Sequence, residues 1–396
     1  VGVYEYANNA WTQLGADIDG EVESSYFGNS VSLSSDGSRV AIGAPYGDDD
    51  DCDNGQVQVY EYSNGAWGQL GATLYEDSDG ENCGDLIEFG WAVSLSSDGS
   101  RLAISVPYGG YEEEGYVVVY EYSNGAWSQL GIGMYGEYEY DWFGASVSMS
   151  SDGSRLAIGA PDQDNYTGAG YIYEYSNSRW RQLGSKISGD WGGNFDGTNG
   201  GWFGYSVSMN SDGSRVAISA PEDDSNGNSS GQVLVFEYDD SASIKWRQLG
   251  TAINGKAEND NFGTVLSMNS DGTFIAISAP YNDNNAYESG QVRVFKYSND
   301  GWNQVAADIN GVIESSSFGY SLSMNSDGSR VSIGAPNGYG NGTGKVQVYS
   351  STANTGQGPV TFQPQTKEEL QTAVDLWVSD NAAALSTYGE INTWDV

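Results

Sequence analysis

Histidine is absent from the 396 residues, and only 15 lysines and arginines accompany 54 aspartates and glutamates, for a formal net charge of −39. Without histidine the chain has no Ser-His-Asp or Cys-His catalytic arrangement and no imidazole ligand for zinc. A polyanion of this kind is repelled by phosphate backbones, which excludes nucleic acid as a partner. No long apolar run occurs, so the sequence predicts no membrane span. Aromatic residues make up 13% and charged residues only 17%, a composition that indicates a folded chain.

A repeat of about 58 residues fills most of the sequence, which is the first feature to establish when predicting a fold. Each copy contains a Ser-Asp-Gly turn, and a tryptophan recurs in step with it. The aspartates of the turn are Asp36, Asp98, Asp152, Asp212, Asp271 and Asp327. The tryptophans are Trp11, Trp67, Trp127, Trp180, Trp246 and Trp302. The sequence is therefore a tandem array of one supersecondary unit.

Each repeat predicts four strands, which in the first complete copy are 30–33, 39–44, 56–62 and 67–70. Ser-Asp-Gly joins the first two strands and Asn-Gly joins the last two, both being tight-turn sequences. The first and second strands have one face of Ser, Ala and Gly and one face of Val, Leu and Ile. Sheets with one small face and one bulky face pack well when identical sheets stack, which favours an all-β propeller of four-stranded blades.

The strand count favours six blades and also allows seven. The first, second and fourth strands occur six times, whereas the third occurs seven times, from 1–6 to 345–349. We expect the N-terminal strand to close the ring by joining the last blade, which leaves one surplus third strand. Because an unpaired strand edge invites pairing, this strand suggests a hypothesis of fibre assembly by strand exchange.

Phe-Gly and Gly-Ala-Pro recur in phase within the repeat, as Phe27-Gly28 with Gly43-Ala44-Pro45 and as Phe143-Gly144 with Gly159-Ala160-Pro161. This pattern resembles the FG-GAP repeat over residues 1–350, in the variety found in large surface proteins of marine microalgae. It is more distantly similar to the integrin α-chain propeller. The resemblance implies a cell-surface or surface-appendage protein. The integrin-type calcium loop, D-x-D-x-D-G, is replaced by Ser-Asp-Gly-Ser, so those calcium sites do not carry over.

The composition changes after residue 350. We expect residues 351–360 to form a linker and residues 361–396 to contain a helix, since Thr366 and Glu369 form a capping box. The segment 361–396 resembles the beginning of a BspA-like surface-protein domain, of which it would be a truncated part.

Long acidic loops join the second strand to the third and the fourth strand to the next repeat. An antiparallel meander places both kinds of loop at one end of the ring, which we call the loop rim; the short turns form the turn rim. The candidate calcium ligands are carboxylates of two such loops: Asp48, Asp49, Asp50, Asp51, Asp53, Asp77 and Asp79. Calcium prefers oxygen ligands of this kind. The alternative interpretation is a solvated acidic surface that keeps the protein soluble.

Two further features of the loop rim point to an extracellular location. Cys52 and Cys83 lie in neighbouring loops, and their even number together with the family resemblance predicts a disulfide, the alternative being two free thiols in a reducing compartment. Three glycosylation sequons begin at Asn165, Asn228 and Asn341, all between second and third strands.

Tryptophans outside the repeat position are the candidate ligand contacts, because a tryptophan at one fixed place in every repeat is expected to pack between blades. These candidates are Trp142, Trp191 and Trp202. No pair of carboxylates is marked out for catalysis, so we expect no enzyme activity. The sequence predicts an extracellular structural or adhesive module whose partners are other surface proteins, copies of itself or glycans. The alternatives are a carbohydrate-binding lectin and a polysaccharide hydrolase.

Overall fold

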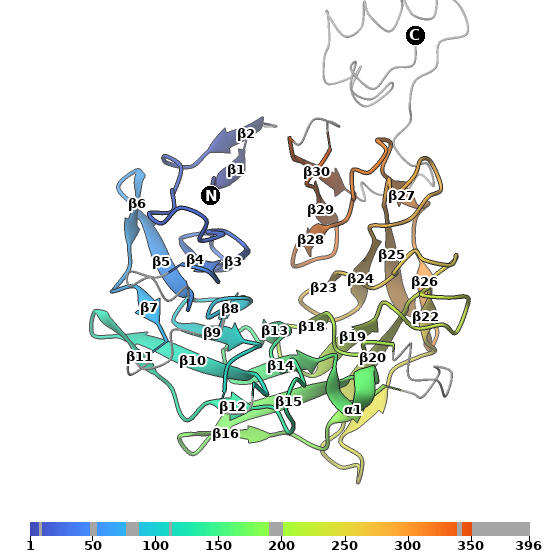
Figure 1. Ribbon diagram of the computed structural model, residues 1–396, viewed down its shortest axis with the longest axis horizontal. Helices are drawn as coiled ribbons and strands as arrows, with labels where there is room; N and C mark the ends of the chain where they lie inside the picture. The colour runs from blue at the N-terminus through green and yellow to red at the C-terminus, as the bar shows by residue number, and fades with distance from the viewer. Residues whose placement is uncertain are drawn as a thin grey trace, which may run out of the picture.

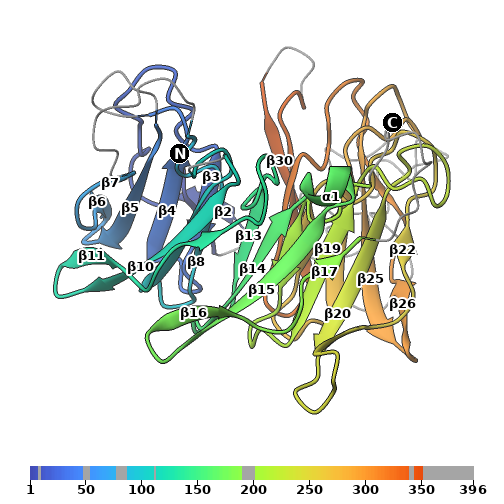
Figure 2. The ribbon, with the colours of Figure 1, turned by 60° about the horizontal axis from the view of Figure 1, so that its bottom comes forward.

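The structure, a computed structural model, describes residues 1–7, 10–47, 54–76, 87–110, 113–189, 201–338 and 343–350. These residues form an all-β propeller of six blades with almost no helix (Figure 1). Figure 2 shows the blades from the side, as twisted sheets standing next to one another around the ring. The predicted fold class is therefore confirmed.

The first to fourth strands of a repeat are called A, B, C and D. Within a blade they pair antiparallel in this order, with A innermost (Figure 1). Blade one has β3 (Ser30–Leu33), β4 (Arg39–Ala44), β5 (Gln56–Ser63), β6 (Ala66–Gln69) and β7 (Leu74–Tyr75). Blade two has β8 (Val93–Leu95), β9 (Arg101–Val106), β10 (Tyr116–Ser123), β11 (Ala126–Gln129) and β12 (Met134–Tyr135). Blade three has β13 (Ser146–Met149), β14 (Arg155–Ala160), β15 (Ala169–Ser176), β16 (Arg179–Gln182) and β17 (Ile187–Ser188).

Blades four and five repeat this plan. Blade four has β18 (Val207–Met209), β19 (Arg215–Ala220), β20 (Gln232–Tyr238), β21 (Trp246–Gln248) and β22 (Ile253–Asn254). Blade five has β23 (Leu266–Met268), β24 (Phe274–Ala279), β25 (Gln291–Ser298), β26 (Gly301–Gln304) and β27 (Ile309–Asn310). In blades one to five the last segment pairs with strand C beyond the end of strand D, so the outer strand is split in two. In blade one the break falls at Gly71, whose φ of +80° leaves the β region.

Blade six has three strands, β28 (Ser321–Met324), β29 (Arg330–Ala335) and β30 (Lys345–Ser350). The N-terminal strand does not join it, contrary to the expected closure. Instead β1 (Tyr4–Ala7) pairs with β2 (Ala10–Gln13) as a separate hairpin, while β30 fills position C of blade six. In the described part of the chain the one helix is α1 (Gln163–Tyr166), a single turn in the link between β14 and β15.

The core lies between blades, where the small face of one sheet meets the bulky face of the next. Ala41, Val57 and Val59 of blade one are in one buried cluster with Val93 and Leu95 of blade two. The approach is close enough that a Cβ at Gly43 would lie 2.1 Å from the carbonyl oxygen of Gly90. The stacking of small against bulky faces, predicted from the strand composition, is confirmed.

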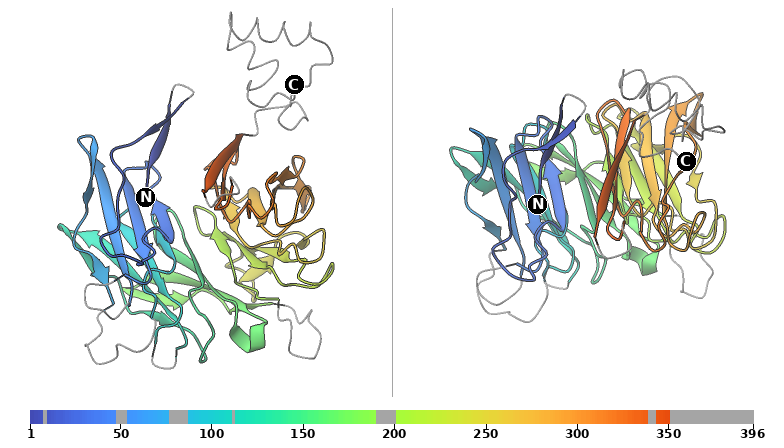
Figure 3. Two further views of the ribbon diagram at one scale, coloured as in Figure 1. Left: turned by 45° about the horizontal axis from the view of Figure 1, so that its top comes forward. Right: turned by 90° about the horizontal axis from the view of Figure 1, so that it is seen from above.

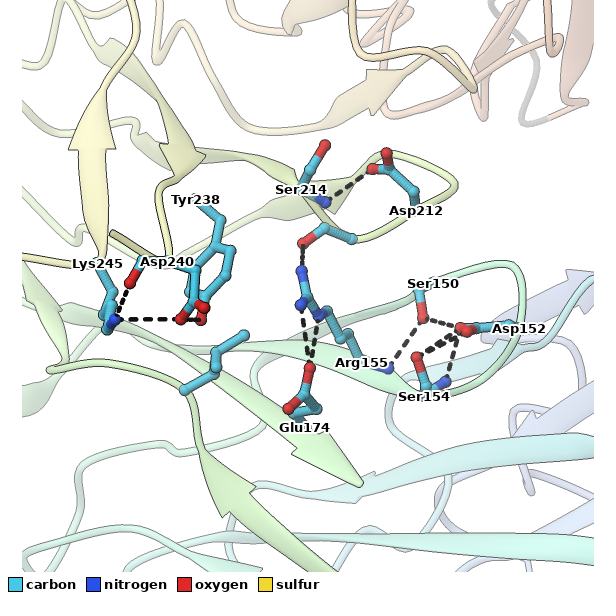
Figure 4. A network of polar contacts seen from close by, with 12 residues as sticks. Ser150, Asp152, Ser154, Arg155, Glu174, Asp212, Ser214, Tyr238, Asp240 and Lys245 are labelled. Carbon is cyan, nitrogen blue, oxygen red and sulfur yellow. Dashed lines mark hydrogen bonds and ion pairs between the residues drawn. The ribbon is translucent and has the colours of Figure 1, made fainter. Parts of the chain in front are cut away.

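The repeat tryptophans join neighbouring blades, as predicted. The indole N–H of Trp127 donates to the carbonyl oxygen of Leu70 in the preceding blade at 2.8 Å, and the same bond recurs in the later blades. The arginine at the start of strand B makes a second repeated contact (Figure 4). Arg155 pairs with Glu174 in its own blade, donates to the carbonyl oxygen of Gly213 at 3.1 Å, and lies over the ring of Tyr238 in the next blade.

The predicted linker 351–360 and the helix-containing segment 361–396 lie outside the described residues. Among the residues that the structure describes, no helix has the length and apolar character needed to cross a membrane.

Candidate ligand-binding site at the loop rim

Most of the predicted loop-rim residues lie outside the described part of the chain: the seven candidate calcium ligands, Cys52, Cys83, Asn341 and Trp191. Asn165 and Asn228 are described and exposed, and their glycosylation stays a prediction. Within the described residues, no group of three or more Asp, Glu, Cys or His side chains could hold a metal ion. Calcium binding and the disulfide therefore also stay predictions.

The two described candidate tryptophans belong to one aromatic cluster. Trp202 stacks on Tyr205 with ring centroids 5.8 Å apart and planes 5° from parallel. Tyr205 in turn packs edge-on against Trp142, with ring centroids 6.5 Å apart. The ring centroid of Trp142 also lies 6.1 Å from that of Trp91 and 5.9 Å from that of Tyr108. The cluster extends over blades two, three and four, so Trp142 and Trp202 come together as parts of one surface.

The repeat itself positions these rings. Trp142 and Trp202 precede the Phe-Gly pair of their blades, whereas Trp91 and Tyr205 follow it. The Phe side chains are buried and anchor the turn at the inner end of strand A. Trp142 and Trp202 have φ values of 57° and 55°, in the left-handed region. The residue before Phe-Gly has a positive φ in every blade, so this strain belongs to the turn and is no sign of a ligand.

A buried carboxylate with a tyrosine partner borders the aromatic cluster. Glu88 is 5% exposed, and the hydroxyl of Tyr46 donates to its Oε1 at 2.7 Å. Burial raises the pKa of Glu88 above its usual range, and the hydrogen bond to Glu88 raises the pKa of Tyr46 to about 12. Oε2 of Glu88 is buried and has no hydrogen-bond partner among the described residues.

A second group of carboxylates lies on blades three and four. Burial, together with the nearby charges of Asp141 and Glu222, raises the pKa of Asp162 to about 6. Burial also raises the pKa of Asp141 and of Glu222. Tyr108 lies near both Glu88 and Asp162. Burial is the largest cause that raises the pKa of Tyr108, and the charges of Glu88 and Asp162 raise it further. We call the whole set the aromatic–acidic cluster: Tyr46, Glu88, Trp91, Tyr108, Asp141, Trp142, Asp162, Trp202, Tyr205 and Glu222.

Several groups of this cluster have unused hydrogen-bonding capacity. The indole N–H of Trp142 and Oδ1 of Asp162 are buried and have no hydrogen-bond partner among the described residues. Asp141 and Asp162 also line a hollow of about 420 Å³ together with Tyr138, Tyr140 and Tyr166. A concave surface with aromatic walls and a few polar groups is the usual form of a small-molecule site. The unpaired groups can accept hydrogen bonds from hydroxyls and donate one.

Three segments match the FG-GAP repeat. They are residues 18–60, 137–173 and 195–236, which include the Phe-Gly turns before β3, β13 and β18. No curated protein matches the chain. The algal, integrin-like and BspA-like resemblances stay expectations.

Solved structures resemble the propeller as a whole. The periplasmic gluconolactonase of Pseudomonas aeruginosa matches with a TM-score of 0.53 and 17% identity, over 88% of this chain and 92% of that one. A putative 6-phosphogluconolactonase from Bacteroides uniformis matches with a TM-score of 0.57 and 12% identity, over 88% and 86%. The Kuenenia stuttgartiensis hydrazine synthase matches with a TM-score of 0.51 and 13% identity, over 82% and 84%. At these identities the likeness shows the fold alone.

Sequence reasoning missed the acidic half of the cluster. Glu88 holds the place before Phe-Gly that Trp142 holds in blade three, and Asp162 and Glu222 follow the Ala-Pro pair as Tyr46 does. The residue before Phe-Gly and the residue after Ala-Pro are therefore the sequence positions from which these carboxylates could have been predicted. The long acidic loops contain more carboxylates and therefore give a stronger compositional signal than these single positions do.

Proposed function

We propose that the chain is an extracellular interaction module that binds neutral or cationic carbohydrate at the aromatic–acidic cluster. The observation that carries this proposal is the meeting of Trp142 and Trp202 with buried carboxylates at the loop rim. The FG-GAP repeats, which are typical of extracellular proteins, support the location.

The chemistry of the cluster suits a sugar. Indole and phenol rings offer flat apolar faces to the C–H face of a pyranose, and their polar edges reach hydroxyl groups. Glu88 and Asp162 supply oxygen acceptors with unused capacity. The net charge of −39 repels anionic glycans, so the ligand is expected to be neutral or to carry amino groups.

An adhesive role follows from the scaffold. A rigid ring presents its loops at one end, where a ligand can be held without rearrangement of the core. Binding to glycans on another surface, or on another copy of the protein, would make the chain the structural or adhesive module that its sequence predicts.

The direct experiment is a glycan array followed by calorimetric titration with the best oligosaccharide. Trp142→Ala and Trp202→Ala should each weaken binding about tenfold or more, since one stacked ring contributes on the order of 1–2 kcal/mol. Trp11→Ala is the matched control, because Trp11 is exposed on β2 and lies outside the cluster. Absence of any binding on the array, or equal losses in all three variants, would refute the proposal.

A hydrolase is the second candidate, favoured by one observation: Asp162 has a pKa of about 6 beside Asp141 and Glu222. A carboxyl group of this kind can act as a general acid near neutral pH. A screen against polysaccharides, with lactones added because two of the similar propellers have gluconolactonase names, tests it. Activity that Asp162→Asn abolishes would support hydrolysis, whereas absence of turnover would leave a binding module.

A further inference from the structure

The β1–β2 hairpin occupies the outer half of an additional blade position between blade six and blade one. On one side, the indole N–H of Trp67 donates to the carbonyl oxygen of Leu14 at 2.7 Å, the same bond that joins Trp127 to Leu70. On the other side, the guanidinium carbon of Arg330 lies 5.2 Å from the ring centroid of Tyr6. Arg155 and Tyr238 make that contact between blades three and four. Figures 1 and 3 show the hairpin and blade six as neighbours around the ring.

The inner half of this position is unfilled by the described residues. β1 pairs with β2 on one side, and no described strand pairs with its other edge, where β4 pairs with β5 in blade one. The backbone bonds that link successive A–B turns run from Ser35 to Ser326 and go no further in the described chain. The described residues therefore place strands C and D at this position, and no described strand occupies places A and B.

The surroundings of Arg330 agree with the absence of described A and B strands at this position. Its counterpart Arg39 pairs with Glu61 in its own blade and donates to the carbonyl oxygen of Gly99, in the A–B turn of the next blade. Arg330 lies opposite Ser350, and among the described residues its guanidinium makes the ring contact but no hydrogen bond or salt bridge. The missing carbonyl acceptor is one that an A–B turn at the vacant position would supply.

The two faces that border the vacancy are apolar and exposed. Val31 on β3 is 54% exposed, whereas its counterpart Val93 in blade two is 9% exposed beneath blade one. Val346 on β30 is 71% exposed, whereas its counterpart Val57 is fully buried against blade two. A missing strand B with a small Ala-Gly face would cover Val31, and a missing Val-Leu-Ile face would cover Val346. Both faces belong to one A–B hairpin.

We propose that the inner half of this position, which no described strand fills, is a docking site for a β-hairpin with the A–B sequence of the repeat, F-G-x-S-V-S-[LM]-x-S-D-G-S-R-[VL]-A-I-[GS]-A. The hairpin adds strand B to the free edge of β1 and strand A inside it. Main-chain bonds to β1 supply affinity, and the two complementary faces supply specificity. The residue at this place in strand B must be small: it is Gly or Ser in every blade, and a Cβ at Gly159 would lie 1.8 Å from the carbonyl oxygen of Gly204 in the adjacent blade.

The test uses the full chain and residues 143–161 as the hairpin. In one arm the synthetic peptide is titrated and binding is followed by fluorescence anisotropy. In the other arm residues 143–169 are fused ahead of Val1, a junction that keeps the repeat spacing because Val1 aligns with Gly170. The controls are a scrambled peptide and the Gly159→Val version of both arms.

We expect saturable one-to-one binding, a rise in Tm of about 5 °C or more for the fused chain, and slower hydrogen exchange of β3 and β30. Neither control should give these effects. No binding and no gain in the fused chain would overturn the proposal. So would concentration-dependent self-association that protects β3 and β30 without the hairpin, because a second copy would then be the occupant. Protection of β3 in the monomer alone would show that the chain closes the position itself.

Discussion

Aspartate has opposite titration behaviour at the two rims of the ring. At the turn rim, the backbone N–H of Ser38 and the hydroxyls of Ser34 and Ser38 donate to Asp36 and lower its pKa to about 2. At the loop rim, burial and neighbouring carboxylates raise the pKa of Asp162 to about 6. Local donors decide the first case and desolvation decides the second, so only the first could be inferred from nearby sequence.

The raised pKa of Asp162 makes stability depend on pH. Below the ordinary value of 3.8 the carboxyl group is neutral in both the folded and unfolded states, and above about 6 the folded state carries the full cost of the buried charge. Asp162→Asn should therefore increase the free energy of unfolding by about 1–2 kcal/mol at pH 8, less than the whole shift because solvent reaches the side chain. At pH 3.5 the variant and the original chain should be equal. Urea unfolding at the two pH values measures both.

Asp36→Asn is the control with the opposite sign. Its carboxylate stabilises the fold above pH 3.8, and this contribution is lost as pH falls towards about 2. The variant should be less stable at pH 7, with the difference shrinking in acid. An equal response of the two variants to pH would contradict the assigned environments.

The guanidinium of Arg155 provides a second prediction at this scale. Arg155→Lys keeps the charge but loses the planar group that bonds Glu174, bonds Gly213 and lies over Tyr238. We expect a loss of about 1–2 kcal/mol in the free energy of unfolding, measured by urea denaturation. Arg247→Lys is the matched control, since Arg247 is exposed and approaches Glu237 only at 3.8 Å, and it should change stability by less than about 0.5 kcal/mol. Equal effects would refute the blade-joining role of Arg155.

At the scale of strands, the sequence predicts the inner elements well and the outer ones less well. The predicted strands 30–33 and 39–44 coincide with β3 and β4 because Ser-Asp-Gly and Pro45 mark their ends. The fourth strand was predicted over 67–70 and matches β6, whereas β7, which follows the break at Gly71, was not predicted. Asn-Gly and Trp mark only the first half, and the second half depends on pairing with strand C, which no local pattern reveals.

The close packing of the small face of strand B against the next blade predicts how substitutions there change stability. Gly159→Ala should destabilise the fold by about 2–4 kcal/mol, because the new Cβ would overlap the carbonyl oxygen of Gly204. Gly68→Ala on β6 is the control, since a Cβ there meets nothing within 4 Å, and it should be neutral or slightly stabilising. Thermal unfolding of both variants distinguishes a required close approach from a general intolerance of side chains in strands.

At the scale of the whole molecule, the candidate site could be predicted only in part. Trp142 and Trp202 were found because they depart from the repeat. Glu88 and Asp162 were not, because their burial arises when neighbouring blades meet and has no trace in a single repeat. The expected closure of blade six by the N-terminal strand was wrong for the same reason, since the spacing of strands in the sequence does not determine which sheet edge a strand will pair with.

The charge of −39 yields a prediction for the ring as a whole. Raising NaCl from 10 to 150 mM should increase Tm, because salt screens the mutual repulsion of the carboxylates. Calcium at 1 mM, added in the presence of that salt, then tests the predicted ligands at Asp48–Asp51, Asp53, Asp77 and Asp79. A further saturable rise that magnesium does not reproduce would support a calcium site. No further rise would favour a solvated acidic surface.

The most direct test of the carbohydrate-binding proposal is the indole ¹H–¹⁵N spectrum of the chain during titration with the best array ligand. The Trp142 signal, assigned by its absence in Trp142→Phe, should shift with saturation, and the Trp202 signal should shift with it. The signals of Trp67, Trp127 and the other blade-joining tryptophans should stay in place, because their N–H groups are bonded between blades. Shifts confined to the blade-joining tryptophans, or no shift at Trp142 under saturating ligand, would contradict the account.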